Sequence, residues 1–118
     1  MLFFYMKRIV LFVSSLFILC CAFTYAFTVP SAPSGYVNDY ASMIHDETRQ
    51  SLDREIALFA ASTTNEIAVA LIPSLEGDTI EHYANTLFIS WEIGKEKTDN
   101  GVLLLISRDD HKMRIEVG

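Results

Sequence analysis

The residues best suited to chemistry lie in two short acidic segments. Asp99-Asn100-Gly101 stands in front of an apolar run, and Asn38-Asp39 stands ahead of the first helical pattern. Side-chain oxygens at a tight turn can coordinate a hard cation such as Ca²⁺ or Mg²⁺. The same residue types also form ordinary turns, because Asn and Gly accept positive φ and Asp bonds its own backbone. Taken alone, the Asp99 segment is typical of a turn.

A stronger hypothesis follows if the two acidic segments meet. We expect Asp39 and Asp99 to lie together at one end of a sheet. Two carboxylates in contact repel each other, which raises the pKa of one of them or recruits a cation. The predicted metal site therefore consists of Asp39, Asp99 and Asn100 and would hold Ca²⁺ or Mg²⁺. The alternative for Asn38-Asp39 is a solvated turn.

Arg114 is the candidate for contact with a phosphate or other anionic ligand, because a guanidinium can clamp phosphate through two hydrogen bonds. It lies on an alternating strand with Lys112 and Glu116 on the same side. The simpler interpretation is a solvated, charged strand face that also protects a sheet edge. The three histidines have no metal-ligand spacing, and the sequence contains no Gly-x-Ser-x-Gly elbow or glycine-rich phosphate loop, so no catalytic residue is assigned.

The elements that must position these residues are readable from hydrophobic periodicity. Helical spacing of apolar residues predicts two amphipathic helices, over 46–61 and 80–91, the second with Asp78 and Glu81 as a capping box. Two apolar runs and one alternating run predict strands over 66–72, 102–106 and 112–117. In the last of these we expect the apolar residues to face the core and the charged ones to face water, namely Met113, Ile115 and Val117 against Lys112, Arg114 and Glu116.

The order of these elements predicts the fold class. A strand, a helix and a strand joined by short connections form a parallel βαβ unit with a right-handed crossover. The polar segment 107–111 predicts an antiparallel hairpin after it. The prediction is an α/β fold with a mixed sheet, a C-terminal hairpin and helices packed on the sheet. Residues 37–41 fit either a short edge strand or a turn. Two helices would leave apolar strand surface under-covered, so the domain would be incomplete at its C-terminus.

The N-terminus predicts export. Lys7 and Arg8 precede an apolar stretch that ends at Ala26, so residues 1–26 fit a signal peptide, with an uncleaved membrane anchor as the alternative. Residues 27–36 form a Pro/Ser linker. Cleavage would leave 92 residues without cysteine and would move the net charge from −6 to −8. Such a domain depends on its core alone, and its acidity argues against nucleic acid and favours divalent cations or basic protein surfaces as partners.

Several blocks of sequence, taken together and in this order, resemble the TPM domain family. They are Val-Asn-Asp-Tyr-Ala (37–41), Glu-Ile-Ala-Val (66–69), Ile-Glu-His-Tyr-Ala (80–84), Trp-Glu-Ile-Gly (91–94), Asp-Asn-Gly-Val-Leu-Leu-Leu (99–105) and Arg-Ile-Glu-Val-Gly (114–118). The resemblance implies an exported α/β domain over residues 37–118, corresponding to the N-terminal part of the full family domain. It also implies calcium or magnesium binding in some members and acid phosphatase activity in one.

Two functions therefore compete at this stage. The first is an extracytoplasmic binding or assembly module that serves envelope or membrane-protein maintenance, with a cation at the Asp39/Asp99 corner and a protein partner of unknown identity. The N-terminal segment would associate it with the membrane. The second is a metal-assisted phosphomonoesterase in which Asp99 holds the metal, Asp39 ligates it or acts as base, and Arg114 steadies phosphate. A non-functional fragment of a longer gene is the third alternative.

Overall fold

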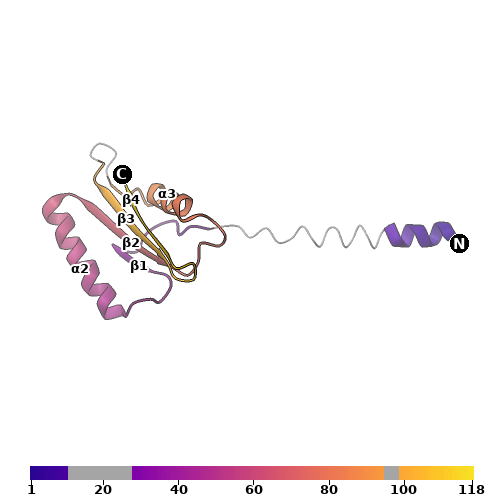
Figure 1. The fold of residues 1–118 in the computed structure, drawn as a ribbon, viewed down its shortest axis with the longest axis horizontal. Helices are drawn as coiled ribbons and strands as arrows, with labels where there is room; N and C mark the ends of the chain where they lie inside the picture. The colour runs from indigo at the N-terminus through magenta and orange to yellow at the C-terminus, as the bar shows by residue number, and fades with distance from the viewer. Residues whose placement is uncertain (11–27, 95–98) are drawn as a thin grey trace.

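The computed structural model of the chain describes residues 1–10, 28–94 and 99–118. Residues 2–10 are helical. The remaining elements follow in the order β1 (Val37–Asp39), α2 (Asp46–Thr63), β2 (Glu66–Ile72), α3 (Ile80–Ser90), β3 (Gly101–Ser107) and β4 (Lys112–Val117). They form a mixed α/β fold in which α2 and α3 lie on opposite sides of a four-stranded sheet (Figure 1). The predicted fold class is therefore confirmed.

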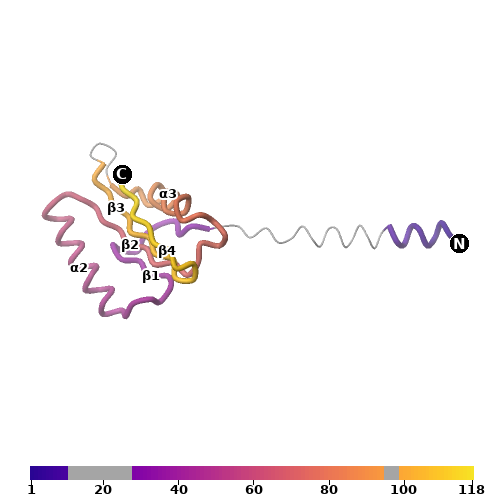
Figure 2. Tube along the Cα trace, in the orientation of Figure 1, coloured from indigo at the N-terminus to yellow at the C-terminus, as the bar shows by residue number. Residues whose placement is uncertain are grey.

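The strand order in the sheet is β1-β2-β3-β4. In the Cα trace the four strands lie between α2 and α3 (Figure 2). The first three strands are parallel, with Val37 opposite Val69 and Glu66 opposite Gly101. The fourth strand runs antiparallel to β3, with Leu104 opposite Ile115. The predicted βαβ unit and hairpin are both present, and residues 37–39 form an edge strand rather than a turn. Because parallel strands share one direction, β1, β2 and β3 all end at the same edge of the sheet.

The core lies between α3 and one face of the sheet. The short helix α3 buries Ile80, Tyr83, Ala84 and Leu87. These residues pack with Ala68, Ala70, Ile72, Leu103 and Leu105 of the two central strands. The N-cap of α3 is Thr79, whose side chain accepts a hydrogen bond from the His82 backbone N–H at 3.2 Å, so the predicted capping box of Asp78 and Glu81 does not form. Asp78 instead contacts His82 Nδ1 at 2.7 Å.

The opposite face of the sheet is only partly covered. Although α2 has 18 residues, none of them is buried. Within the described residues α2 contacts β1 and β2 but not β3 or β4. The side chains of β3 and β4 on this side form what we call the open face, consisting of Val102, Leu104, Ile106, Met113, Ile115 and Val117.

The expected orientation of β4 is wrong. Met113, Ile115 and Val117 are 60–65% exposed, so they do not face the core. Strand pairing explains the reversal, since Arg114 stands opposite Leu105 and Glu116 opposite Leu103, on the side covered by α3. Apart from α2, which stops at β2, no described element packs on the other side of the hairpin. The apolar residues of β4 therefore lie on its solvent-exposed face, and Arg114 and Glu116 lie on the face covered by α3.

The predicted signal peptide over 1–26 and the loop 95–98 fall largely or wholly outside the described residues. In the linker, Val29 packs against the core, and the Pro30 carbonyl accepts a hydrogen bond from Trp91 Nε1 at 2.8 Å. Among the described helices, none combines the length and the apolar character that a membrane span requires. The described part of the linker is thus in contact with the domain.

Candidate functional site

The predicted meeting of Asp39 and Asp99 at one end of the sheet is wrong. Asp39 ends β1 and pairs with Leu71, near the carboxyl end of the parallel strands. Asp99 precedes β3, whose first residue pairs with Glu66 at the amino end. Leu71 and Glu66 are five positions apart along β2, which is roughly 16 Å in the strand direction. A single ion cannot bridge the two carboxylates, because cation–oxygen bonds are about 2.0–2.6 Å long.

Asp39 has a structural role at the end of β1. Its Oδ1 accepts hydrogen bonds from the backbone N–H groups of Ala41 and Met43, both at 3.1 Å, and its Oδ2 accepts one from Ile44 at 3.0 Å. Desolvation alone would raise the pKa of Asp39, but the backbone N–H donors together hold that pKa below its ordinary value of 3.8. The carboxylate therefore shapes the β1–α2 loop.

The carboxyl edge of the sheet contains two further charged residues that the sequence did not single out. Arg108 Nη1 donates to the Ala41 carbonyl at 2.8 Å, which ties the β3–β4 turn to the β1–α2 loop. Asp110 accepts from Ser107 Oγ at 2.6 Å and from the Leu75 backbone N–H at 2.8 Å. These two donors lower the pKa of Asp110. Three loops are thus held together by side chains that reach across sequence-distant backbone, a role that spacing alone does not reveal.

The amino edge contains the Asp99 segment. Asn100 Nδ2 donates to the Thr64 carbonyl, and the Asn100 carbonyl accepts from the Glu66 backbone N–H at 3.0 Å. A Cβ added to Gly101 would lie 2.7 Å from the Gly94 backbone nitrogen, so only glycine fits this approach of two backbones. Asp99 itself is exposed and has a φ of 40°. The motif is mainly a structural junction between α2, β2 and the segment after α3.

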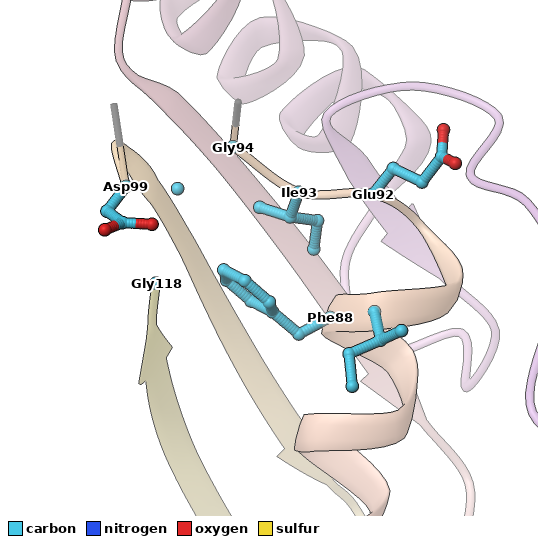
Figure 3. Close-up of a pocket in the computed structure, with 8 residues that line it drawn as sticks. Phe88, Glu92, Ile93, Gly94, Asp99 and Gly118 are labelled. Atoms are coloured by element: carbon cyan, nitrogen blue, oxygen red, sulfur yellow. The ribbon is translucent and has the colours of Figure 1, made fainter. Parts of the chain in front are cut away.

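An open pocket of about 580 Å³ lies beside this junction, lined by Phe88, Ile89, Glu92, Ile93, Gly94, Asp99, Gly101 and Gly118. Figure 3 shows Asp99 and Gly118 on one side of the pocket and Phe88 projecting toward it from α3. The carboxylate of Glu92 points away from that of Asp99. Over residues 1–10, 28–94 and 99–118, no group of three or more His, Cys, Asp or Glu side chains is arranged to hold a metal ion.

Arg114, the predicted phosphate contact, lies apart from both acidic corners. It stands in the middle of β4, on the side of the sheet opposite the open face. Its Nε donates to Glu116 Oε2 at 2.7 Å, and the side chain is 36% exposed. The structure therefore brings none of Asp39, Asp99 and Arg114 together. Asn100 lies next to Asp99 by sequence, and its amide is engaged with the end of α2.

Comparison with known proteins gives a family and a fold relative. Residues 37–118 match the TPM domain family. A solved structure with a similar fold is the solution NMR structure of the N-terminal domain of a protein from P. gingivalis, at 28% sequence identity and a TM-score of 0.65. The alignment covers 70% of this chain and 53% of that one, so this chain spans about half of its relative's length. No curated protein matches.

The Asp39 contacts predict a pH-dependent stability. Because the pKa of Asp39 is lowered on folding, its contribution is fully present above the ordinary value of 3.8 and is lost as the pH falls through that value and the lower folded one. Asp39→Ala should lower the free energy of unfolding by about 1–2 kcal/mol at pH 7. It should also flatten the dependence of the urea midpoint on pH between 6 and 3. Glu55→Ala, on the exposed part of α2, should change stability by less than about 0.5 kcal/mol. Equal effects of the two substitutions would contradict the assigned role of Asp39.

Proposed function

The chain belongs to the TPM domain family, and from that premise we propose that it is a protein-binding or assembly module whose binding surface is the open face. The observation that carries the proposal is the exposure of Met113, Ile115 and Val117 on one side of a regular strand. Scattered apolar residues on a surface are ordinary, whereas a contiguous apolar patch marks a site of interaction. Here the exposed residues continue into the half-buried Leu104 and Ile106 of β3.

The two sides of the sheet support this interpretation by their contrast. Four of the 11 residues of α3 are buried, whereas none of the 18 residues of α2 is. Leu52 and Phe59 of α2 are each 41% exposed although they belong to its apolar stripe. An amphipathic helix normally buries its apolar stripe, but among the described residues no element covers this part of α2.

The position of that missing neighbour follows from the rotation of α2. Asp53 faces β1, since its Oδ1 accepts a hydrogen bond from the Val37 backbone N–H at 2.9 Å. With 3.6 residues per turn, Leu52 and Phe59 lie about 100–120° around the helix from Asp53, both on the same side. Since β1 is an edge strand and β2, β3 and β4 all lie to one side of it, we infer that this flank of α2 is directed toward β3 and β4. We infer that the flank of α2 and the open face together make up one apolar binding surface.

The occupant that we propose for this apolar surface is an amphipathic helix with basic residues beside its own apolar stripe. Two strands span roughly 10 Å, and neighbouring helices pack about 8–10 Å apart, so one helix beside α2 would cover β3 and β4. The exposed Glu55 lies on the same flank of α2 as Phe59 and complements a basic residue. The net charge of −6 on this chain also favours a positively charged partner.

We further propose that this module works outside the cytoplasm, in envelope or membrane-protein maintenance, near the membrane that its N-terminal segment would contact. The basic and then apolar composition of residues 7–26 and the resemblance to an exported family support this location. The partner helix would then belong to another envelope protein. The location outside the cytoplasm and the origin of the partner helix are both inferred independently of the geometry of the open face.

A divalent cation remains a second candidate ligand, now limited to the Asp99 and Asn100 corner. The favouring observation is the exposed Asp99 carboxylate at the rim of an open pocket. We regard the phosphomonoesterase as the weaker alternative, because that mechanism needs metal, base and phosphate clamp within one site. Asp39 and Arg114 lie in other parts of the molecule.

The helix-binding proposal can be tested with two synthetic peptides. One is a 14-residue helix with a leucine stripe and lysines elsewhere, and the other has glutamate in place of each lysine. We expect the lysine peptide to shift the methyl NMR signals of Leu104 and Ile115 and to leave those of Leu87 and Leu103 in place. Ile115→Lys should abolish these shifts, whereas Leu58→Lys, at an α2 position that is 72% exposed, should preserve them. Shifts centred on the α3 side, or stronger binding of the glutamate peptide, would refute the proposal.

The cation alternative is tested by calcium and magnesium titration of the full chain. Binding at the Asp99 corner predicts amide shifts at residues 99–101 and none at 38–41, with loss of the response in Asp99→Asn. Under the same conditions we expect no hydrolysis of p-nitrophenyl phosphate. Metal-dependent turnover that disappears in Asp99→Asn would instead establish the phosphomonoesterase.

A further inference from the structure

The outer edge of β4 is a second feature that calls for a partner. β4 is the last strand in the sheet order. The Gly118 backbone N–H donates to the Gly101 carbonyl at 3.1 Å, which identifies these two residues as a hydrogen-bonded pair. Hydrogen-bonded and non-hydrogen-bonded pairs alternate along an antiparallel ladder. The backbone N–H and C=O groups of residues 112, 114 and 116 are therefore hydrogen-bonded to β3. Those of Met113, Ile115 and Val117 point away from the sheet.

We propose that this edge pairs with the same edge of a second copy of the chain, antiparallel and centred on Ile115. In that register Ile115 stands opposite its own copy, Met113 stands opposite Val117, and the outward N–H and C=O groups of all three residues are paired. The inference goes beyond the proposed function, since it concerns the backbone edge of β4 rather than the open face.

Charge complementarity selects this register. Centring on Ile115 places Arg114 opposite Glu116 of the second copy, and the two-fold symmetry repeats the contact. Shifting the centre to either neighbouring residue would place Arg114 opposite Arg114 or Glu116 opposite Glu116. Centring on Met113 would place Lys112 opposite Arg114. Like charges directly opposite each other on paired strands are destabilising.

The geometry of the non-hydrogen-bonded pair favours the same contact. Residues 114 and 116 occupy the pairs whose side chains approach most closely across the new interface, at about 4.5 Å between Cα atoms. Within one chain, Arg114 Nε already bonds Glu116 Oε2 at 2.7 Å, and both side chains are partly buried on the α3 side, at 36% and 17% exposure. Pairing would join two such ion pairs into one cluster of four alternating charges. The edge also contains no proline, the residue that commonly blocks such pairing.

Register-specific cross-linking tests the proposal in the full chain, with Cys20→Ser and Cys21→Ser as background. After mild oxidation, Ile115→Cys should form a disulfide-linked dimer, because the roughly 5.5 Å between Cα atoms of a hydrogen-bonded pair suits a disulfide. Met113→Cys should cross-link little with itself but readily when mixed with Val117→Cys. Leu58→Cys, exposed on α2, measures random collision. Equal yields for Met113→Cys alone and Ile115→Cys, or an Ile115→Cys yield no higher than that of Leu58→Cys, would overturn the proposal.

A charge swap provides the second arm. At low ionic strength, Arg114→Glu added to Ile115→Cys should lower the dimer yield several-fold, and Glu116→Arg added to both should restore it. Failure of the swap to restore cross-linking in a folded chain, judged by circular dichroism, would contradict the register. Both charge substitutions lie on the α3 side, so a chain that carries Arg114→Glu and Glu116→Arg but keeps Ile115 should bind the peptide at the open face as the unaltered chain does. If Ile115→Cys gives no specific cross-link while the unaltered chain still binds the peptide, the pairing of β4 edges is rejected and the proposed function of the open face stands.

Discussion

Apolar side chains on both faces of a sheet require cover on both faces, and this constraint organises the whole molecule. On one face α3 meets it with a compact core that includes Leu103 and Leu105. On the other face α2 contacts β1 and β2, and no element in the described part of the chain covers the hairpin of β3 and β4. The exposure of Ile115 and the lack of buried residues in α2 have the same cause, because no described element lies over this face beside α2.

The fold was predictable because its signals are local. Helical and alternating periodicities identified α2, α3 and the strands, and the short connections required parallel pairing of β2 and β3. The orientation of β4 was not predictable from alternation alone. Alternation separates the apolar from the charged side, but which side is covered depends on the helix that packs there. In this chain α3 lies over Arg114 and Glu116, so the usual assignment is reversed.

The predicted meeting of Asp39 and Asp99 was wrong for a topological reason. Asp39 follows a strand and Asp99 precedes one, and in parallel strands those positions lie at opposite edges. The same rule, applied to the sequence, would have separated them. The structural roles of Asp39, Arg108 and Asp110 could not be predicted from the sequence. Each side chain forms a hydrogen bond with a backbone group of a loop, and this contact exists only in the folded chain.

The most direct measurement of the central claim is the relaxation of methyl groups by a soluble gadolinium chelate. If the open face is uncovered in the chain, the methyl groups of Met113, Ile115 and Val117 should relax about as fast as those of the exposed Leu58. The methyl groups of Leu103 and Leu105 should relax far more slowly, because both residues are fully buried. Slow relaxation at Ile115, comparable to that at Leu105, would contradict the account, because some part of the chain would then already cover this face.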